Sequence, residues 1–244
     1  MVKVRNSIKW QDYAFVFILI SDLISLAVGN ENIHAFIKPL VVPSIAFFFY
    51  SKELIKFKIG KYLAFVLLFS WLGDILLIFD SSLHFLLGLF SFLIAHFFYI
   101  LIFSSTTMPF KIRAIHTITI LFFLILAVFI LQTVWGKTEN LQFPVLIYTI
   151  IISVMGVTAT FNTIENRDYY SLFGALLFII SDALIALNTF QIVSVEVINF
   201  PFLIMFTYIC DQLILVYSVV NQMNKNQLSL IVRVIKSPFA NYSF

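Results

Sequence analysis

Several ionisable side chains lie inside long apolar runs of this sequence. They are Asp22, Lys38, Asp74, His96, Asp182 and Asp211. A charged group at the centre of a membrane helix costs about 2.5–3.5 kcal/mol on insertion scales, and such groups usually face the interior of the bundle. Carboxyl groups and an imidazole can donate, accept and relay protons. The residue types therefore indicate proton-transfer chemistry in the interior, in an enzyme or in a transporter.

The composition indicates that membrane helices position these residues. The chain has 244 residues, of which 61% are hydrophobic and 11% charged, and its mean hydropathy is +1.03. A soluble domain carries about 25% charged residues, and one bilayer span needs about 20 apolar residues. The sequence therefore predicts an all-α polytopic membrane protein, a bundle of eight transmembrane helices with short loops. The spans are expected at residues 13–29, 34–50, 61–79, 84–103, 113–132, 143–161, 171–189 and 199–220.

The spans form a single predicted domain, residues 1–222, followed by a cytoplasmic C-terminal tail, residues 223–244. This tail is expected to lie on the inner surface as a basic amphipathic segment or to be a disordered end. Basic residues precede the first span, as they do in a signal peptide, but the length of the span and Asp22 favour a retained helix. The single cysteine, Cys210, excludes an intrachain disulfide.

The distribution of cations predicts the orientation. Thirteen of the fifteen Lys and Arg residues fall on one side of the eight-span topology. The positive-inside rule then places both termini in the cytoplasm, with the plasma (inner) membrane as the expected location. The net charge of +3 is accounted for by topology, so the expected partner is the lipid bilayer and no nucleic acid is expected.

The depths of the polar residues predict one shared cavity. At 1.5 Å of rise per residue, the aspartates of the odd-numbered spans reach the middle or the outer half of the bilayer. Lys38 reaches the same layer, unless it extends to the interface instead. His96 lies deeper, at the floor of a cavity that opens toward the outer leaflet. The groups expected around it are Asp22, Lys38, Asp74, His96, Tyr99, Asp182, Tyr208 and Asp211.

A weak internal echo relates two of the acids. The segment GDILLI at 73–78 resembles SDALIA at 181–186, and FLI at 92–94 recurs at 202–204. The third and seventh spans, like the fourth and eighth, are then candidate repeat partners, with Asp74 and Asp182 facing each other across a central site. Chance is the alternative explanation, because SDLISLA at 21–27 matches as well.

The sequence contains no Walker loop, GxGxxG, HExxH, GxSxG or CxxC motif. No two of the four histidines are spaced i,i+4, which excludes a multi-histidine metal site within one helix. We expect neither a metal nor a cofactor, with a site built from His96 and several aspartates as the alternative.

Five segments, in order and spacing, carry a resemblance to a known family. They are FIKPLVVP (36–43), WLGDILLI (71–78), GLFSFLIAHFFYI (88–100), GALLFIISDALIAL (174–187) and TYICDQLI (207–214). In these segments the chain resembles the YhhN-like lysoplasmalogenase family of eight-helix integral membrane proteins. Members of that family cleave the vinyl ether bond of lysoplasmalogens, giving a fatty aldehyde and a glycerophospho-alcohol. The resemblance thus implies a lysophospholipid substrate.

The resemblance also implies roles for the matching positions. Asp74 of the GD pair and Asp182 of the SD pair become the catalytic acids. The chain departs from the family pattern at Asp211, which fills an alanine position, and at Asp22, which has no counterpart; we place both with the substrate-binding residues. The pocket residues implied by the family motifs are Lys38, His96, Tyr99, Tyr208 and Gln212.

The chemistry suits two buried carboxyl groups. A vinyl ether hydrolyses when its β-carbon is protonated, which gives an oxocarbenium ion that water traps as a hemiacetal. Two carboxyl groups at a low-dielectric pocket can supply a protonated acid and a stabilising anion. The expected function is therefore an ether hydrolase with Asp general acid/base chemistry. The alternatives are a proton-coupled transporter of a small or lipid-like substrate and a non-catalytic protein whose acids pair with Lys38 and with hydroxyl groups.

Overall fold

The computed structural model describes residues 10–49, 54–107, 113–138, 141–193 and 199–236, with side chains from Tyr13 to Lys225. The described chain is helical and contains no strand. Its elements are α1 (Trp10–Ala27), α2 (Glu31–Phe49), the 3₁₀ turn η1 (Leu54–Lys56), α3 (Lys58–Leu76), α4 (Ser82–Thr106), α5 (Ala114–Val134), the 3₁₀ turn η2 (Trp135–Lys137), α6 (Gln142–Asn166), α7 (Tyr169–Thr189) and α8 (Phe200–Lys236).

The polytopic helical bundle predicted from the sequence is confirmed. Seven of the described helices, α2 to α8, are long and apolar enough to cross a membrane, and the apolar part of α1, Tyr13–Ala27, is shorter. The third span ends earlier than predicted, at Leu76, because a turn precedes α4. At the other end of the chain, α8 continues to Lys236, so the predicted tail begins as an extension of the last helix, and residues 237–244 lie outside the described part.

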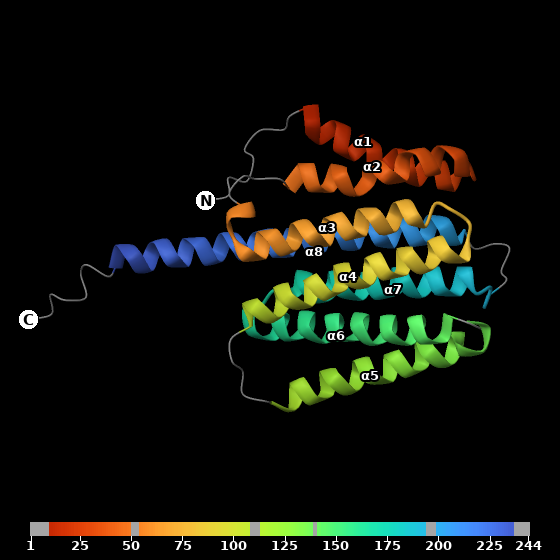
Figure 1. Cartoon of the computed structure of the whole chain (residues 1–244). Helices are drawn as coiled ribbons and strands as arrows, with labels where there is room; N and C mark the ends of the chain where they lie inside the picture. Colours follow the sequence, from red (N-terminus) through yellow and green to blue (C-terminus); the bar gives the residue numbers. More distant parts are fainter. Residues whose placement is uncertain (1–9, 50–53, 108–112, 139–140, 194–198, 237–244) are drawn as a thin grey trace, which may run out of the picture.

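The helices run up and down the bundle as neighbouring pairs (Figure 1). Along the chain, α1 packs on α2, α3 on α4, α5 on α6 and α7 on α8, while α8 also contacts α1, α2 and α3. The pair α1–α2 and the helix α5 lie at opposite edges, and α8 extends beyond the other helices at one end (Figure 1). Helices α3, α4, α6, α7 and α8 therefore form the middle of the bundle, where the buried polar residues are found.

Glycines bring the central helices close together. A Cβ atom added to Gly73 of α3 would lie 2.6 Å from the ring of Phe92 of α4, and one added to Gly174 of α7 would lie 2.7 Å from Leu215 of α8. Real Cβ atoms do not approach neighbours this closely, so a larger residue at either position must displace the partner side chain or the helix that carries it. The absence of a side chain at Gly73 thus sets the distance between α3 and α4 next to Asp74.

Two prolines inside α2 tie this helix to α3. The carbonyl of Pro39 would normally accept a hydrogen bond from residue 43, but Pro43 has no N–H. The indole nitrogen of Trp71 donates to that carbonyl instead, at 2.8 Å. The freed carbonyl of Pro39 thus fixes α2 against α3 close to Lys38.

A separate polar cluster lies where α7 begins. The Asp168 carboxylate, at the start of α7, accepts hydrogen bonds from the Ser218 hydroxyl at 2.5 Å and from the Gln222 amide of α8. All three side chains are buried. The Asp168 carboxylate is thus a buried acid whose hydrogen-bond donors come from within the protein.

Candidate active site

One aromatic ring connects the polar residues at the middle of the bundle. Phe178 of α7 is fully buried. Its ring packs edge-on against His96 of α4 at a centroid distance of 4.5 Å and against Tyr208 of α8 at 5.9 Å. His96 and Tyr208 belong to two different hydrogen-bonded groups, one around Asp182 and one around Asp74. The two acids therefore belong to neighbouring clusters on either side of a shared aromatic residue.

The Asp74 cluster is built by α3 and α8. The Tyr208 hydroxyl donates to Asp74 Oδ2 at 2.9 Å. One turn before Asp74 on the same face, Ser70 accepts from the Gln212 side chain at 3.4 Å. Only 2% of Asp74 is exposed, and the charge of Lys38 on α2 acts on its carboxyl group. This cluster is closed, with one hydrogen-bond donor and one nearby cation for its acid.

The Asp182 cluster is built by α4, α6 and α7. The Tyr148 hydroxyl donates to Asp182 Oδ2 at 2.5 Å. The same oxygen lies 3.2 Å from His96 Nε2, which is also 2.9 Å from the Tyr148 hydroxyl. The three polar groups form a triangle, and both contacts to Asp182 use Oδ2. The second oxygen, Oδ1, is therefore free of these contacts.

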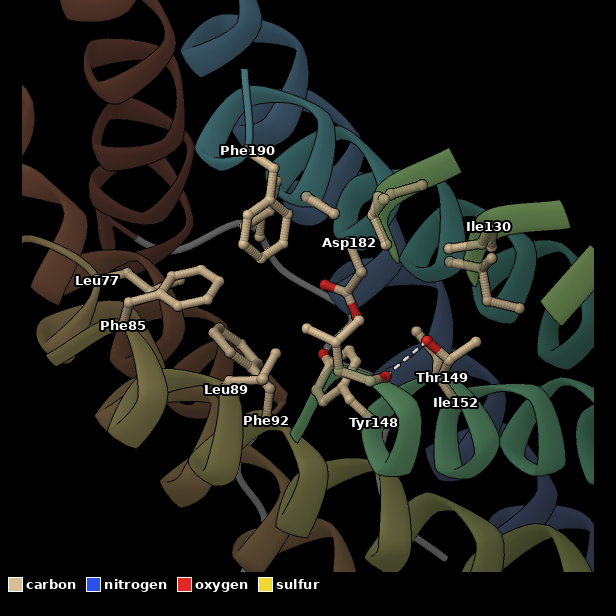
Figure 2. A pocket seen from close by; sticks show the side chains of 16 residues that line it. Leu77, Phe85, Leu89, Phe92, Ile130, Tyr148, Thr149, Ile152, Asp182 and Phe190 are labelled. Carbon is tan, nitrogen blue, oxygen red and sulfur yellow. Dashed lines mark hydrogen bonds between the residues drawn. The ribbon is translucent and has the colours of Figure 1, made fainter. Parts of the chain in front are cut away.

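A narrow apolar cavity adjoins Asp182. It has a volume of about 60 Å³, and helices α3 to α7 contribute its walls. In Figure 2 the Asp182 carboxyl group points into a space surrounded by Phe85, Phe92 and Tyr148, with Ile130 and Ile152 farther along. Nearly all of the lining is aliphatic or aromatic, so the carboxyl group faces an environment that suits a hydrocarbon chain.

A larger charged vestibule of about 810 Å³ lies at the end of the bundle opposite the C-terminal end of α8 (Figure 1). The first turns of α2 and the connections α3–α4, α5–α6 and α7–α8 contribute to it. Its charged lining residues are Glu31, Lys38, Asp80 and Lys137, and His34 joins them. The vestibule thus carries two cations and two anions at one mouth of the bundle.

The vestibule and the apolar cavity adjoin each other. Leu77, Phe85, Ile185 and Phe190 line both. Their side chains form the boundary between a charged chamber and a hydrocarbon-lined one, and Asp182 is on the apolar side of it. Such a pair of compartments matches an amphipathic molecule with a polar head and an apolar chain.

The single cavity expected from the sequence is not what the folded chain contains. Within the described residues, Lys38 lines the vestibule and Asp182 lines the apolar cavity, whereas neither lining includes Asp74, His96 or Asp211. The expectation considered depth alone, and depth does not say whether side chains such as Phe92 and Phe178 fill the space between two polar groups. The acids are neighbours, but packed aromatic rings lie between them.

A further predicted residue, Asp22, makes a contact near the vestibule. Asp22 of α1 is fully buried, and its Oδ1 lies 2.9 Å from His34 Nδ1 of α2. His34 lines the vestibule, and Asp22 is also within electrostatic reach of Asp74.

Asp211 and Tyr99 occupy the interior without partners. Both are fully buried, and among the described residues neither the two Asp211 oxygens nor the Tyr99 hydroxyl has a hydrogen-bond partner. The charge of Asp211 acts on Tyr99, and it interacts with Asp74 and with Asp182. Asp211 therefore lies within electrostatic reach of both clusters.

Three residues of the site were missed in the sequence. Tyr148, which completes the Asp182 cluster, is a lone tyrosine in an Ile-rich span, and only a search for buried hydroxyl groups as well as ionisable groups selects it. His34 was noted only as one of four scattered histidines. Lys137 was counted as a single cation in an outer loop, and no sequence signal links it to Lys38.

The described residues contain no group of three or more His, Cys, Asp or Glu side chains arranged to hold a metal ion. The site instead offers carboxyl groups, an imidazole and phenol hydroxyls, which move protons.

Comparison with known proteins identifies the family to which the chain belongs. No curated protein and no solved structure matches the chain. The model of the YhhN family matches residues 33–219, which include α2 to α7 and most of the membrane-spanning part of α8. Both acid clusters and the Tyr148 position fall inside this range, whereas Asp22 falls outside it. The chain belongs to the YhhN family.

Proposed function

We propose that this protein is a membrane-embedded hydrolase that cleaves the vinyl ether bond of lysoplasmalogens. The observation that carries the proposal is the position of Asp182, whose carboxyl group faces a hydrocarbon-lined cavity next to a charged vestibule. Family membership supports the same reaction, because the YhhN family is associated with lysoplasmalogenase activity.

The two compartments suggest how the substrate binds. The phosphate lies in the vestibule near Lys38 and Lys137, and the alkenyl chain enters the apolar cavity beside Asp182. A free volume of about 60 Å³ holds only part of a long chain. The rest of the chain therefore needs side chains of the cavity wall to move, or it passes between helices into the lipid.

In the proposed reaction Asp182 is the proton donor. Its Oδ1, which makes neither of the contacts to Tyr148 and His96, gives a proton to the β-carbon of the vinyl ether. The carboxylate left behind is stabilised by those two neighbours at Oδ2, and the substrate becomes an oxocarbenium ion. General acid catalysis of this kind contributes about 10²–10⁴-fold.

Asp74 is the second acid of the proposed reaction. Burial works against the charged form of Asp74, whereas the charge of Lys38 and the hydrogen bond from Tyr208 work in its favour. In the proposed reaction Asp74 is the carboxylate that stabilises the cation. Water adds to the oxocarbenium carbon and gives its released proton to the Asp182 carboxylate, the acid that faces the cavity. The hemiacetal then collapses to the aldehyde and the glycerophospho-alcohol without a net proton change.

The vestibule is proposed to face the outside, because the basic loops predict that both termini, and so the far end of α8, are cytoplasmic. A plasma (inner) membrane location follows from the same argument and is part of the proposal.

The test is aldehyde release by detergent-solubilised protein from lysoplasmenylcholine and lysoplasmenylethanolamine. We expect hydrolysis in micelles, where no proton gradient exists, and weaker binding of an alkenylglycerol that lacks the phosphate. The saturated-ether analogue is the matched control and should not react. Absence of aldehyde, together with uptake of a labelled substrate only in sealed vesicles under a proton gradient, would replace the hydrolase with a transporter.

A further inference from the structure

An apolar groove that the proposed reaction does not use lies between α2 and α3. It has a volume of about 260 Å³, and η1 and α8 also contribute to its lining. Leu63 and Val216, which line it, are buried. Pro43, Ala64 and Leu68, which also line it, are exposed and lie within the membrane-spanning lengths of their helices. The groove therefore has its floor inside the bundle and opens sideways, toward the surrounding lipid.

The lining of the groove suits hydrocarbon and not water. Every side chain that lines it is aliphatic or aromatic. The one polar side-chain atom among them, the indole nitrogen of Trp71, already donates to the Pro39 carbonyl. An ordered water needs two to four polar partners, which these side chains do not offer. The groove also shares no lining residue with the Asp182 cavity or with the vestibule, so it is a separate compartment.

The groove has the length of a lipid chain in one leaflet. On α3 its lining runs from Gly60 to Trp71, a distance of about 16 Å at 1.5 Å of rise per residue. Half of a bilayer core of about 30 Å measures about 15 Å. The start of α3 lies at the end of the bundle from which α8 extends (Figure 1). An acyl chain of the leaflet at that end therefore fits along the groove.

Lysines lie at the end of the groove where a headgroup would be. Lys56 and Lys61 are exposed, and each directly follows a residue that lines the groove. Every charged residue in the segment 54–65 is a lysine. The third of them, Lys58, lies over the ring of Tyr62, 5.5 Å from its centroid. Cations beside a membrane surface attract anionic lipids, and no acid of this segment opposes them.

We propose that the groove binds one acyl chain of an anionic phospholipid, whose headgroup phosphate lies beside Lys56 and Lys61. This lipid is a bound component of the bundle and not a substrate, because no acid lines the groove. Its chain runs along α3 as far as Trp71, and Val216 of α8 lies beneath it. The proposal does not depend on the hydrolase function, since binding can be measured without turnover.

The test uses Trp71 as a reporter inside the groove. The chain has three tryptophans, so Trp10→Phe together with Trp135→Phe leaves Trp71 as the source of tryptophan fluorescence. The full chain is reconstituted in vesicles with equal amounts of phosphatidylglycerol and phosphatidylcholine, and the acyl chains of one lipid or the other carry bromine, which quenches tryptophan at short range. We expect the quenching to give a preference of at least about tenfold for phosphatidylglycerol, because two lysines face its headgroup.

Two charge variants of this reporter protein decide whether the preference comes from the groove. Lys56→Gln combined with Lys61→Gln should reduce the preference to about one. Lys225→Gln is the matched control and should keep it. Lys225 is exposed and follows Val216 by nine residues, which is two and a half helical turns, so it lies on the side of α8 opposite the groove.

Three outcomes overturn the proposal. Equal quenching by the two lipids means that the groove takes lipid chains without selecting a headgroup. Absence of quenching by either lipid means that no lipid chain reaches Trp71. An equal loss of preference in Lys225→Gln and in the double variant means that the lipid responds to the charge of the whole surface and not to the lysines at the groove.

A second variant closes the groove without changing its charge. Ala64 is an exposed lining residue, so Ala64→Phe places a ring in the groove without disturbing the core. We expect this variant to elute as the wild type does in size-exclusion chromatography and to lose the phosphatidylglycerol preference of Trp71 quenching. In detergent, phosphatidylglycerol should raise the unfolding temperature of the wild type and not that of Ala64→Phe, because a lipid that binds the folded state stabilises it. An equal rise in both proteins would place the lipid elsewhere and contradict the proposal.

Discussion

The surroundings of Asp74 and Asp182 differ although both acids sit in similar short motifs. Asp74 is closed off in a packed interface between α3 and α8, with one hydroxyl donor. The Asp182 side chain is 9% exposed and lines a cavity, and one of its carboxyl oxygens contacts both a tyrosine and a histidine. The difference indicates two roles: the acid at the cavity meets the substrate, and the enclosed acid acts through its charge.

The weak repeat in the sequence makes this comparison more informative. The pairs α3–α4 and α7–α8 are both tightly packed neighbours, and each acid receives a partner from the other pair: Tyr208 of α8 for Asp74, and His96 of α4 for Asp182. The exchange is therefore reciprocal at the level of helices. Tyr148 of α6 breaks the likeness, because Asp182 alone has this additional donor.

The largest predicted effect separates the two acids. Asp182→Asn should lower kcat by about 10²–10⁴-fold because it removes the proton that is given to carbon. Asp74→Asn keeps the Tyr208 hydrogen bond but removes the charge, and it should lower kcat by about 10²-fold with little change in KM. Aldehyde release measured over a range of substrate concentrations gives both constants. Near-normal kcat in Asp182→Asn would contradict the assignment of Asp182 as the proton donor. Size-exclusion chromatography is the control for folding, and each variant should elute as the wild type does.

The sequence allowed the elements and the buried acids to be predicted, but not which tyrosine or histidine bonds to which acid. Long apolar runs fix the helices because only a helix satisfies its own backbone in lipid. An aspartate inside such a run is expected to be buried and to face the protein interior. Asp74, Asp182 and Asp211 were predicted as site residues for this reason. Gly73, next to Asp74, lets the ring of Phe92 approach closely.

What the sequence did not reveal is which buried groups are connected by open space. Depth along a helix placed Lys38, Asp74 and Asp182 in one layer, but the division between vestibule, cavity and packed core depends on rotamers of Phe92, Phe178 and their neighbours. These rotamers are determined jointly by several helices. The role of Tyr148 depends on tertiary contact in the same way, because a hydroxyl group inside a span is inexpensive and common.

The next prediction sharpens the comparison at the two tyrosines. Tyr148→Phe removes the donor that stabilises the Asp182 carboxylate in the proposed reaction, and kcat should fall by about ten- to a hundredfold, the loss expected for one charge-assisted hydrogen bond of about 1.5–3 kcal/mol. Tyr208→Phe removes the donor to Asp74 and should have a smaller effect, since Lys38 continues to favour the Asp74 carboxylate.

Each substitution removes one tyrosine hydroxyl that donates to an aspartate. The ratio of the kcat values of the two variants is therefore compared, and the stability of both is recorded. Equal losses would mean that the two acids have equivalent roles, and a larger loss in Tyr208→Phe would reverse their proposed order.

The smallest effect is expected outside the site, and it tests whether a buried aspartate in this bundle must be functional. Ser218→Ala removes one hydrogen bond to Asp168 while Gln222 still donates to the same carboxylate. Stability should fall by about 1 kcal/mol, because one partner of a buried bonded group is lost and the other is kept. The unfolding temperature in detergent should drop by a few degrees, with kcat and KM unchanged. A large loss of kcat without a loss of stability would show that the Asp168 cluster also takes part in the proton chemistry, and the contrast between a satisfied structural acid and the unpartnered Asp211 would no longer hold.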